Sequence, residues 1–132
     1  MNTAPRLLEG FTVEVHRVIY DPLLETPMGK PYAFVYFITI HNKSDQALRV
    51  KGRKWIVREE EGDVTVLEGE GVVGEYPYLL PGEFFSYNSY HVTAGPAVAE
   101  GAYLAVTDKG EAVIAMIPEF ELIPTAASQQ FE

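Results

Sequence analysis

The segment that decides the fold is Tyr32–Ile40, which reads YAFVYFITI. Aromatic and β-branched residues alternate here with further apolar residues, a pattern typical of a β-strand that is covered on both faces over its first half. The polar stretch His41–Asp45 then ends the run as a turn. The segment therefore predicts a central strand of a sheet.

Further strands are expected on both sides of this one. Alternating apolar residues predict them at 11–20, 48–57, 64–66 and beyond, 84–91, 102–107 and 112–117, with turns between them. Glu59–Asp63 reads as a hairpin tip, and Asp108–Gly110 as a second one with glycine at a position of positive φ. No stretch combines helical periodicity with helix caps. About seven strands predict an all-β, immunoglobulin/fibronectin-III-like β-sandwich.

Shifts in the apolar phase predict two irregularities in these strands. One lies near Arg17 and the other next to Gly52, and each indicates a β-bulge. Trp55 follows the second shift and is expected to fill the core between the sheets.

Composition and charge limit the function. The 132 residues predict one domain, 1–132, with a core of about 11–124 and frayed ends at Met1–Glu9 and Ala126–Glu132. The absence of cysteine excludes disulfides and thiolate chemistry. A net charge of −9 disfavours nucleic acid and anionic membranes as partners. The first residues lack the apolar stretch of a signal peptide, so a cytoplasmic protein is expected.

A glycine-rich segment, GEGVVG at 69–74, matches the G-x-G-x-x-G pattern of dinucleotide-binding loops. That pattern requires a following helix, which Pro77 and Pro81 exclude, and Glu70 and Glu75 would oppose a phosphate. A dinucleotide site is therefore not expected.

A structural role is favoured for these glycines instead. Gly69, Gly71 and Gly74 would let the backbone pass tightly from one sheet to the other, with Val72 and Val73 in the core at that crossing. An anion-binding nest of backbone N–H groups is the alternative.

The chain resembles a known family at this segment and beyond. Residues 69–75, then Pro77, Leu79 and 81–83, resemble the signature of the ApaG domain. Supporting similarity runs through 32–42, Arg53-Lys54-Trp55-Ile56, Gly101-x-Tyr103 and 117–122, so that it covers about Phe11 to Pro124. Two departures are Lys54, where the family has histidine, and a missing methionine in 95–100.

The resemblance implies a fibronectin-III-like sandwich and no cofactor or established catalytic set. Bacterial members of the family are associated with cobalt resistance and magnesium transport, and their gene often lies beside one for a diadenosine tetraphosphate hydrolase. Eukaryotic relatives occur in F-box proteins and in a DNA-polymerase-interacting protein. These associations imply protein–protein binding.

A basic cluster and a group of tyrosines are the candidate binding residues. Arg49, Lys51 and Arg53 would share one strand face if no bulge intervened, and could bind an anion or an acidic partner, although a solvated sheet face is favoured. Tyr76 and Tyr78 flank the glycine segment and are candidates for a protein-binding surface.

Metal binding and catalysis have weaker support. The three histidines, His16, His41 and His91, fall on different strands, so no metal site is predicted. Ser89 and His91 would share one strand face, but a triad also needs an orienting carboxylate, so no catalytic residue is assigned.

The sequence thus predicts a non-enzymatic module that binds a protein, whose identity it does not disclose. A sensor of pyrophosphate, nucleotide phosphate or another small anion is the alternative, and a hydrolase of phosphate compounds is the third hypothesis.

Overall fold

The computed structural model describes residues 4–124 and 128–130. Seven long strands form its frame: β2 (Phe11–Tyr20), β3 (Tyr32–Asn42), β4 (Leu48–Glu59), β5 (Val64–Glu70), β7 (Phe84–Thr93), β8 (Ala97–Thr107) and β9 (Ala112–Leu122). The described residues add three short strands, β1 (Arg6–Leu7), β6 (Tyr78–Leu79) and β10 (Ser128–Gln130). No helix in this part of the chain could cross a bilayer.

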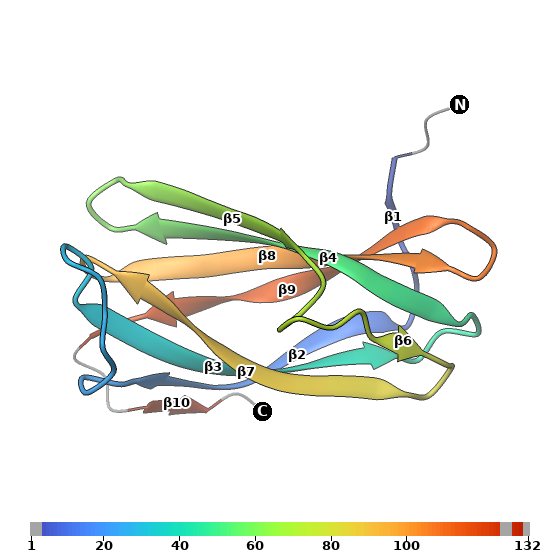
Figure 1. The fold of residues 1–132 in the computed structure, drawn as a ribbon, viewed down its shortest axis with the longest axis horizontal. Coiled ribbons are helices and arrows are strands. Elements are labelled where there is room, and N and C mark those ends of the chain that lie inside the picture. Colours follow the sequence, from blue (N-terminus) through green and yellow to red (C-terminus); the bar gives the residue numbers. More distant parts are fainter. Residues whose placement is uncertain (1–3, 125–127, 131–132) are drawn as a thin grey trace.

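Two sheets pack face to face (Figure 1). One has the order β1-β9-β8-β4-β5, with β6 paired to β4, and the other has the order β10-β2-β3-β7. This arrangement confirms the predicted all-β, fibronectin-III-like sandwich. The strands β5 and β7 end their sheets on one side of the sandwich, whereas β2 and β9 contact each other on the opposite side.

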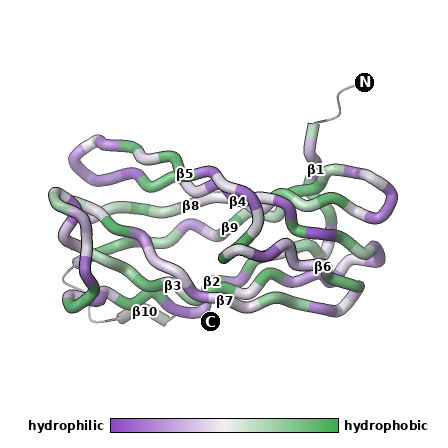
Figure 2. The backbone as a smooth tube through the Cα atoms, viewed as in Figure 1, coloured by the Kyte–Doolittle hydropathy of each residue, from purple (hydrophilic) through white to green (hydrophobic). Residues whose placement is uncertain are grey.

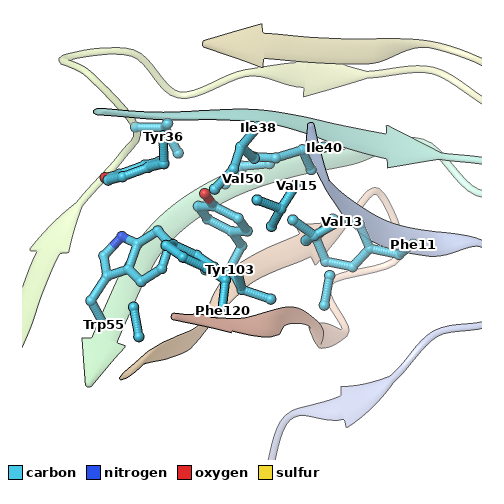
Figure 3. Close-up of a cluster of buried hydrophobic side chains, with 14 of the residues drawn as sticks. Phe11, Val13, Val15, Tyr36, Ile38, Ile40, Val50, Trp55, Tyr103 and Phe120 are labelled. Carbon is cyan, nitrogen blue, oxygen red and sulfur yellow. The ribbon is translucent and has the colours of Figure 1, made fainter. Parts of the chain in front are cut away.

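The core lies between the sheets and is anchored by β3. Tyr36, Ile38 and Ile40 point inward from this strand and are at most 4% exposed, as the alternation in the sequence predicts. β3 lies between β2 and β7, which confirms that it is a central strand. Figure 3 shows Tyr36 and Trp55 at one end of the core, with Tyr103 between them and the valines of β2.

Both predicted bulges are present. The β2–β3 register shifts between Val15 and Arg17, and the β4–β8 register shifts between Val50 and Gly52. The second bulge changes which face the following residues occupy, because one extra residue reverses the alternation of side chains. Arg49 and Lys51 therefore face outward, whereas Arg53 lies on the inner side with Trp55.

The glycine segment does not cross between the sheets, contrary to the prediction. After β5 the chain stays with the first sheet, because Leu79 of β6 pairs with Leu48 of β4. The crossing comes afterwards, at Leu80–Glu83, before β7 enters the other sheet. Of the two valines expected in the core, Val72 is fully buried but Val73 is 50% exposed.

The chain ends carry pairings that the sequence analysis did not predict. Arg6–Leu7 pairs in parallel with β9, and Ser128–Gln130 pairs with β2. Strands of two or three residues are too short to show an alternating pattern. Residues 1–3, 126–127 and 131–132, which belong to the ends predicted to fray, lie outside the described residues, as does Thr125.

Candidate functional site

The glycine segment forms a tight turn that is closed by its own backbone. The N–H of Val72 donates to the carbonyl of Glu75 at 2.8 Å, and the N–H of Glu75 donates back to Val72 at 2.9 Å. Val73 and Gly74 stand between them with φ of 45° and 81°. Two positive φ values between a reciprocally bonded pair describe a type I′ turn. The N–H of Gly71 is also used, by the carbonyl of Lys51 at 2.8 Å.

Two of the glycines are required by close approach as well as by conformation. A Cβ on Gly69 would lie 2.7 Å from Nη2 of Arg53, so the guanidinium occupies the space that a side chain would need. Gly71 has a φ of 64°, and a Cβ there would collide with the carbonyl oxygen of Glu75. The path of the loop therefore explains why glycine is needed at residues 69 and 71.

Two arginines of the predicted basic cluster hold this loop. Arg53 donates from Nη1 to the carbonyls of Glu70 and Gly71, at 2.8 and 3.1 Å. Arg49 donates from Nη1 to the carbonyl of Tyr76 at 2.9 Å, and its guanidinium stacks 4.8 Å from the ring centre of Tyr78. These arginines therefore approach the loop from different faces of β4.

The lysines of β4 are placed apart from Arg53. Lys51 is exposed and has no ion pair within the described residues, while Lys54 pairs with Glu68 at 3.6 Å on the outer face. The basic residues that are close in sequence thus do not converge on one point. The two loop tyrosines are 45% (Tyr76) and 40% (Tyr78) exposed.

Tyr78 is held by a carboxylate from a neighbouring hairpin. Its hydroxyl donates to Oδ2 of Asp108 at 2.7 Å, and this hydrogen bond raises the pKa of Tyr78. The ring presents a face to Arg49 and the hydroxyl is already bonded, so its remaining exposed surface is largely aromatic.

A second site, which the sequence analysis did not identify, is a cleft of about 370 Å³ between β5 and β7. Arg53 belongs to it, so the cleft adjoins the glycine loop. The lining residues are Tyr36, Arg53, Trp55, Val66, Leu67, Glu68, Ser89, Tyr90 and His91. They come from four strands of both sheets, and most of them carry a polar group.

Two buried polar atoms of residues that line this cleft lack a partner among the described residues. They are Nε1 of Trp55 and Nε2 of His91, in side chains that are 2% and 4% exposed. The two rings meet edge to face with their centres 4.5 Å apart. Buried polar groups are normally hydrogen-bonded, so two unpaired nitrogens in one cleft are unusual.

Burial also sets the charge of the cleft. It lowers the pKa of His91 to about 4, so the imidazole is neutral at pH 7. Burial raises the pKa of Tyr36, and its hydroxyl stays protonated as well. Arg53 is therefore the one cation among the lining residues, and Glu68, at the rim, is the one carboxylate.

Ser89 and His91 both line the cleft, as their alternate positions on one strand predict. No carboxylate is hydrogen-bonded to His91 in the described structure, so an orienting group for a triad is not in place there. Among the same residues no group of three or more histidine, aspartate or glutamate side chains is arranged to hold a metal ion.

Comparison with known proteins identifies the family. The ApaG domain matches residues 24–107. The chain belongs to the ApaG domain family. The Protein ApaG of Acidithiobacillus ferrooxidans is 38% identical over 104 residues, covering 78% of this chain and 82% of the relative. The Protein ApaG of Deinococcus radiodurans is 38% identical over 112 residues, covering 84% of each.

Solved structures share the ApaG fold. The crystal structure of the putative ApaA protein from Bordetella pertussis superposes with a TM-score of 0.76 at 30% identity, over 90% of this chain and 99% of that one. An X-ray structure of a structural-genomics target has a TM-score of 0.79 at 33% identity, over 90% of each chain. The resemblance inferred from the glycine segment is thereby confirmed.

Proposed function

We propose that this ApaG-family chain is a non-enzymatic protein-binding module that receives an extended segment of its partner at the free edge of β5. The proposal rests on the position of β5, which is the last strand of its sheet. Val64, Val66 and Leu67 on this strand are 57%, 52% and 46% exposed. Strand edges of this kind are templates for an added strand.

The backbone of β5 is oriented for such pairing. The flanking bonds Gly71 N–H to Lys51 and Glu59 N–H to Asp63 fix the alternation of the β4–β5 ladder. In an antiparallel ladder every second residue bonds inward, so Val66 and Glu68 direct their N–H and C=O groups away from β4. These groups are the ones a partner strand would use.

The side chains of β5 suit an apolar partner. The segment VTVL at 64–67 has no lysine or proline, the residues that commonly protect an edge. Figure 2 shows this hydrophobic stretch beside the hydrophilic turn that joins β4 to β5. Leu104 and Met116, 37% and 57% exposed, are further exposed apolar residues of the same sheet. Any effect of the family on cobalt resistance or magnesium homeostasis is proposed to act through the bound partner.

Substitutions on the edge strands β5 and β7 test this function. Val66→Pro removes an outward N–H without touching the β4 ladder, and Val66→Lys is the second variant if proline impairs folding. Phe84→Lys, at a 62% exposed residue of β7, is the matched control. A partner captured by cross-linking from host lysate should be lost with both Val66 variants and retained with Phe84→Lys. Retention by the Val66 variants, or loss with Phe84→Lys alone, would contradict binding at β5.

A further inference from the structure

The cleft between β5 and β7 has an unfilled hydrogen-bonding capacity. The indole Nε1–H of Trp55 is a donor and never an acceptor, so its missing partner must supply an acceptor atom. Nε2 of His91, in the tautomer that carries its proton there, is a second donor without a partner. The cleft thus calls for a ligand group with more than one acceptor oxygen.

Arg53 supplies the charge for such a group. Its two hydrogen bonds to the loop, to the carbonyls of Glu70 and Gly71, both leave from Nη1. Nε and Nη2 belong to the same planar fork and make no hydrogen bond to the described residues. A guanidinium fork binds a planar carboxylate through two parallel hydrogen bonds. Because Gly69 has no Cβ, the guanidinium of Arg53 has room to lie in this position.

The charge of the lining residues favours a carboxylate over a phosphate as the ligand group. Arg53 is the one positive charge among the lining residues, and Glu68, the one carboxylate, lies at the rim and pairs with Lys54 at 3.6 Å. The hydroxyl of Tyr36 and the imidazole of His91 are neutral at pH 7. A phosphate carries up to two charges and is commonly bound by several backbone N–H groups. Those of Gly71, Val72 and Glu75 in the adjoining loop are already used.

We propose that this cleft binds a carboxylate group, held by Arg53, Trp55 Nε1–H and His91 Nε2–H. A free small acid and an acidic side chain of a bound protein segment share this chemistry. The cleft volume of about 370 Å³ lies in the usual range for ligand pockets and accommodates either source. The inference goes beyond strand addition at β5 and does not depend on it.

The single tryptophan gives a direct readout, because one indole cross-peak appears in the ¹H–¹⁵N spectrum of the labelled full chain. Titration with sodium acetate to about 100 mM should shift this peak with saturation, as millimolar binding of a small ligand would. Sodium chloride at the same ionic strength should not shift it. An unmoved peak, an equal shift in chloride, or a response to phosphate alone would overturn the proposal.

Two arginine variants make the test specific. Arg53→Gln and Arg49→Gln each remove side-chain bonds to the loop backbone, but only Arg53 lines the cleft. We expect acetate affinity to fall by about tenfold or more in Arg53→Gln and to persist in Arg49→Gln. If Arg53→Gln does not fold, Ser89→Asp, which places a competing carboxylate in the cleft, should abolish the acetate shift. Acetate binding that survives the folded cleft variant would overturn the proposal.

A further arm identifies the source of the carboxylate. The capped peptides acetyl-TVEVT-amide and acetyl-TVQVT-amide differ only in the carboxylate. Binding of the glutamate peptide about tenfold more tightly than acetate, with weakening by Val66→Pro, would support an acidic side chain on a strand at β5. Acetate binding without that gain would support a free small acid and would leave the carboxylate site intact even if strand addition fails.

Discussion

The guanidinium of Arg53 packs directly against the backbone of Gly69. A Cβ on Gly69 would lie only 2.7 Å from Nη2 of Arg53. This relationship joins two strands, because Arg53 is on β4 and Gly69 is its cross-strand partner on β5. It also joins two features of the site, since the same guanidinium holds the loop carbonyls and lines the cleft.

Gly69→Ala should therefore displace Arg53 and weaken the loop. A methyl group at residue 69 requires the guanidinium to move, and the bonds from Nη1 to the carbonyls of Glu70 and Gly71 are lost or lengthened. We expect a loss of about 1–2 kcal/mol in the free energy of unfolding, measured with urea. Gly95→Ala is the matched control, because nothing lies within 4 Å of a Cβ there. Equal stability of the two variants would refute this account of Gly69.

The fold was predictable from the sequence because the alternation of apolar and polar residues along a strand indicates which side chains are buried. The inward residues of β3 and the bulge at Gly52 were visible in the apolar phase. The cleft was not predictable, because the inward direction of Arg53 depends on how that bulge reverses the faces of β4. The unpaired nitrogens of Trp55 and His91 depend on the packing of strands from different sheets. Only the alternate spacing of Ser89 and His91 gave a local signal, and it did not disclose what faces them.

The turn at Val73 offers a test of backbone strain. Val73 has a φ of 45°, a conformation that disfavours a β-branched residue, and it is 50% exposed, so little burial compensates. Val73→Asn should raise the free energy of unfolding by about 1 kcal/mol, or the melting temperature by roughly 4 °C. Val64→Asn, at a similarly exposed valine within a strand, should give no such gain. A stability loss at residue 73 would show that the valine side chain makes a compensating contact.

The hydroxyls of Tyr87 and Tyr103 form a hydrogen bond between the two sheets. Burial raises the pKa of both tyrosines, so both hydroxyls stay protonated at neutral pH. Tyr87→Phe or Tyr103→Phe should each cost about 1–3 kcal/mol, because each leaves the other hydroxyl without this partner. The double variant should cost less than the sum by about 1 kcal/mol. Strict additivity in urea unfolding would contradict the coupling, and Tyr90→Phe, at a 52% exposed ring, should change stability by less than about 0.5 kcal/mol.

Stability should fall in acid because of His91. Its pKa is about 4 in the folded protein, where burial among Tyr36, Trp55 and Arg53 disfavours the imidazolium, against an ordinary value of 6.5. Between these two values the unfolded chain binds a proton that the folded chain does not. The contribution of neutral His91 is therefore complete above pH 6.5 and is lost as the pH falls towards 4, by roughly 3 kcal/mol in all.

His91→Gln isolates this contribution. The lowered pKa of Glu14, which His41 stabilises by a hydrogen bond, also makes stability fall in acid, but it is shared by both proteins and cancels in their difference. Urea unfolding of both proteins from about pH 7 to about pH 4 should show the wild type losing roughly 3 kcal/mol relative to the variant. Parallel pH profiles would mean that burial does not lower the pKa of His91 and that the imidazole gains its proton in the folded cleft as readily as in the unfolded chain.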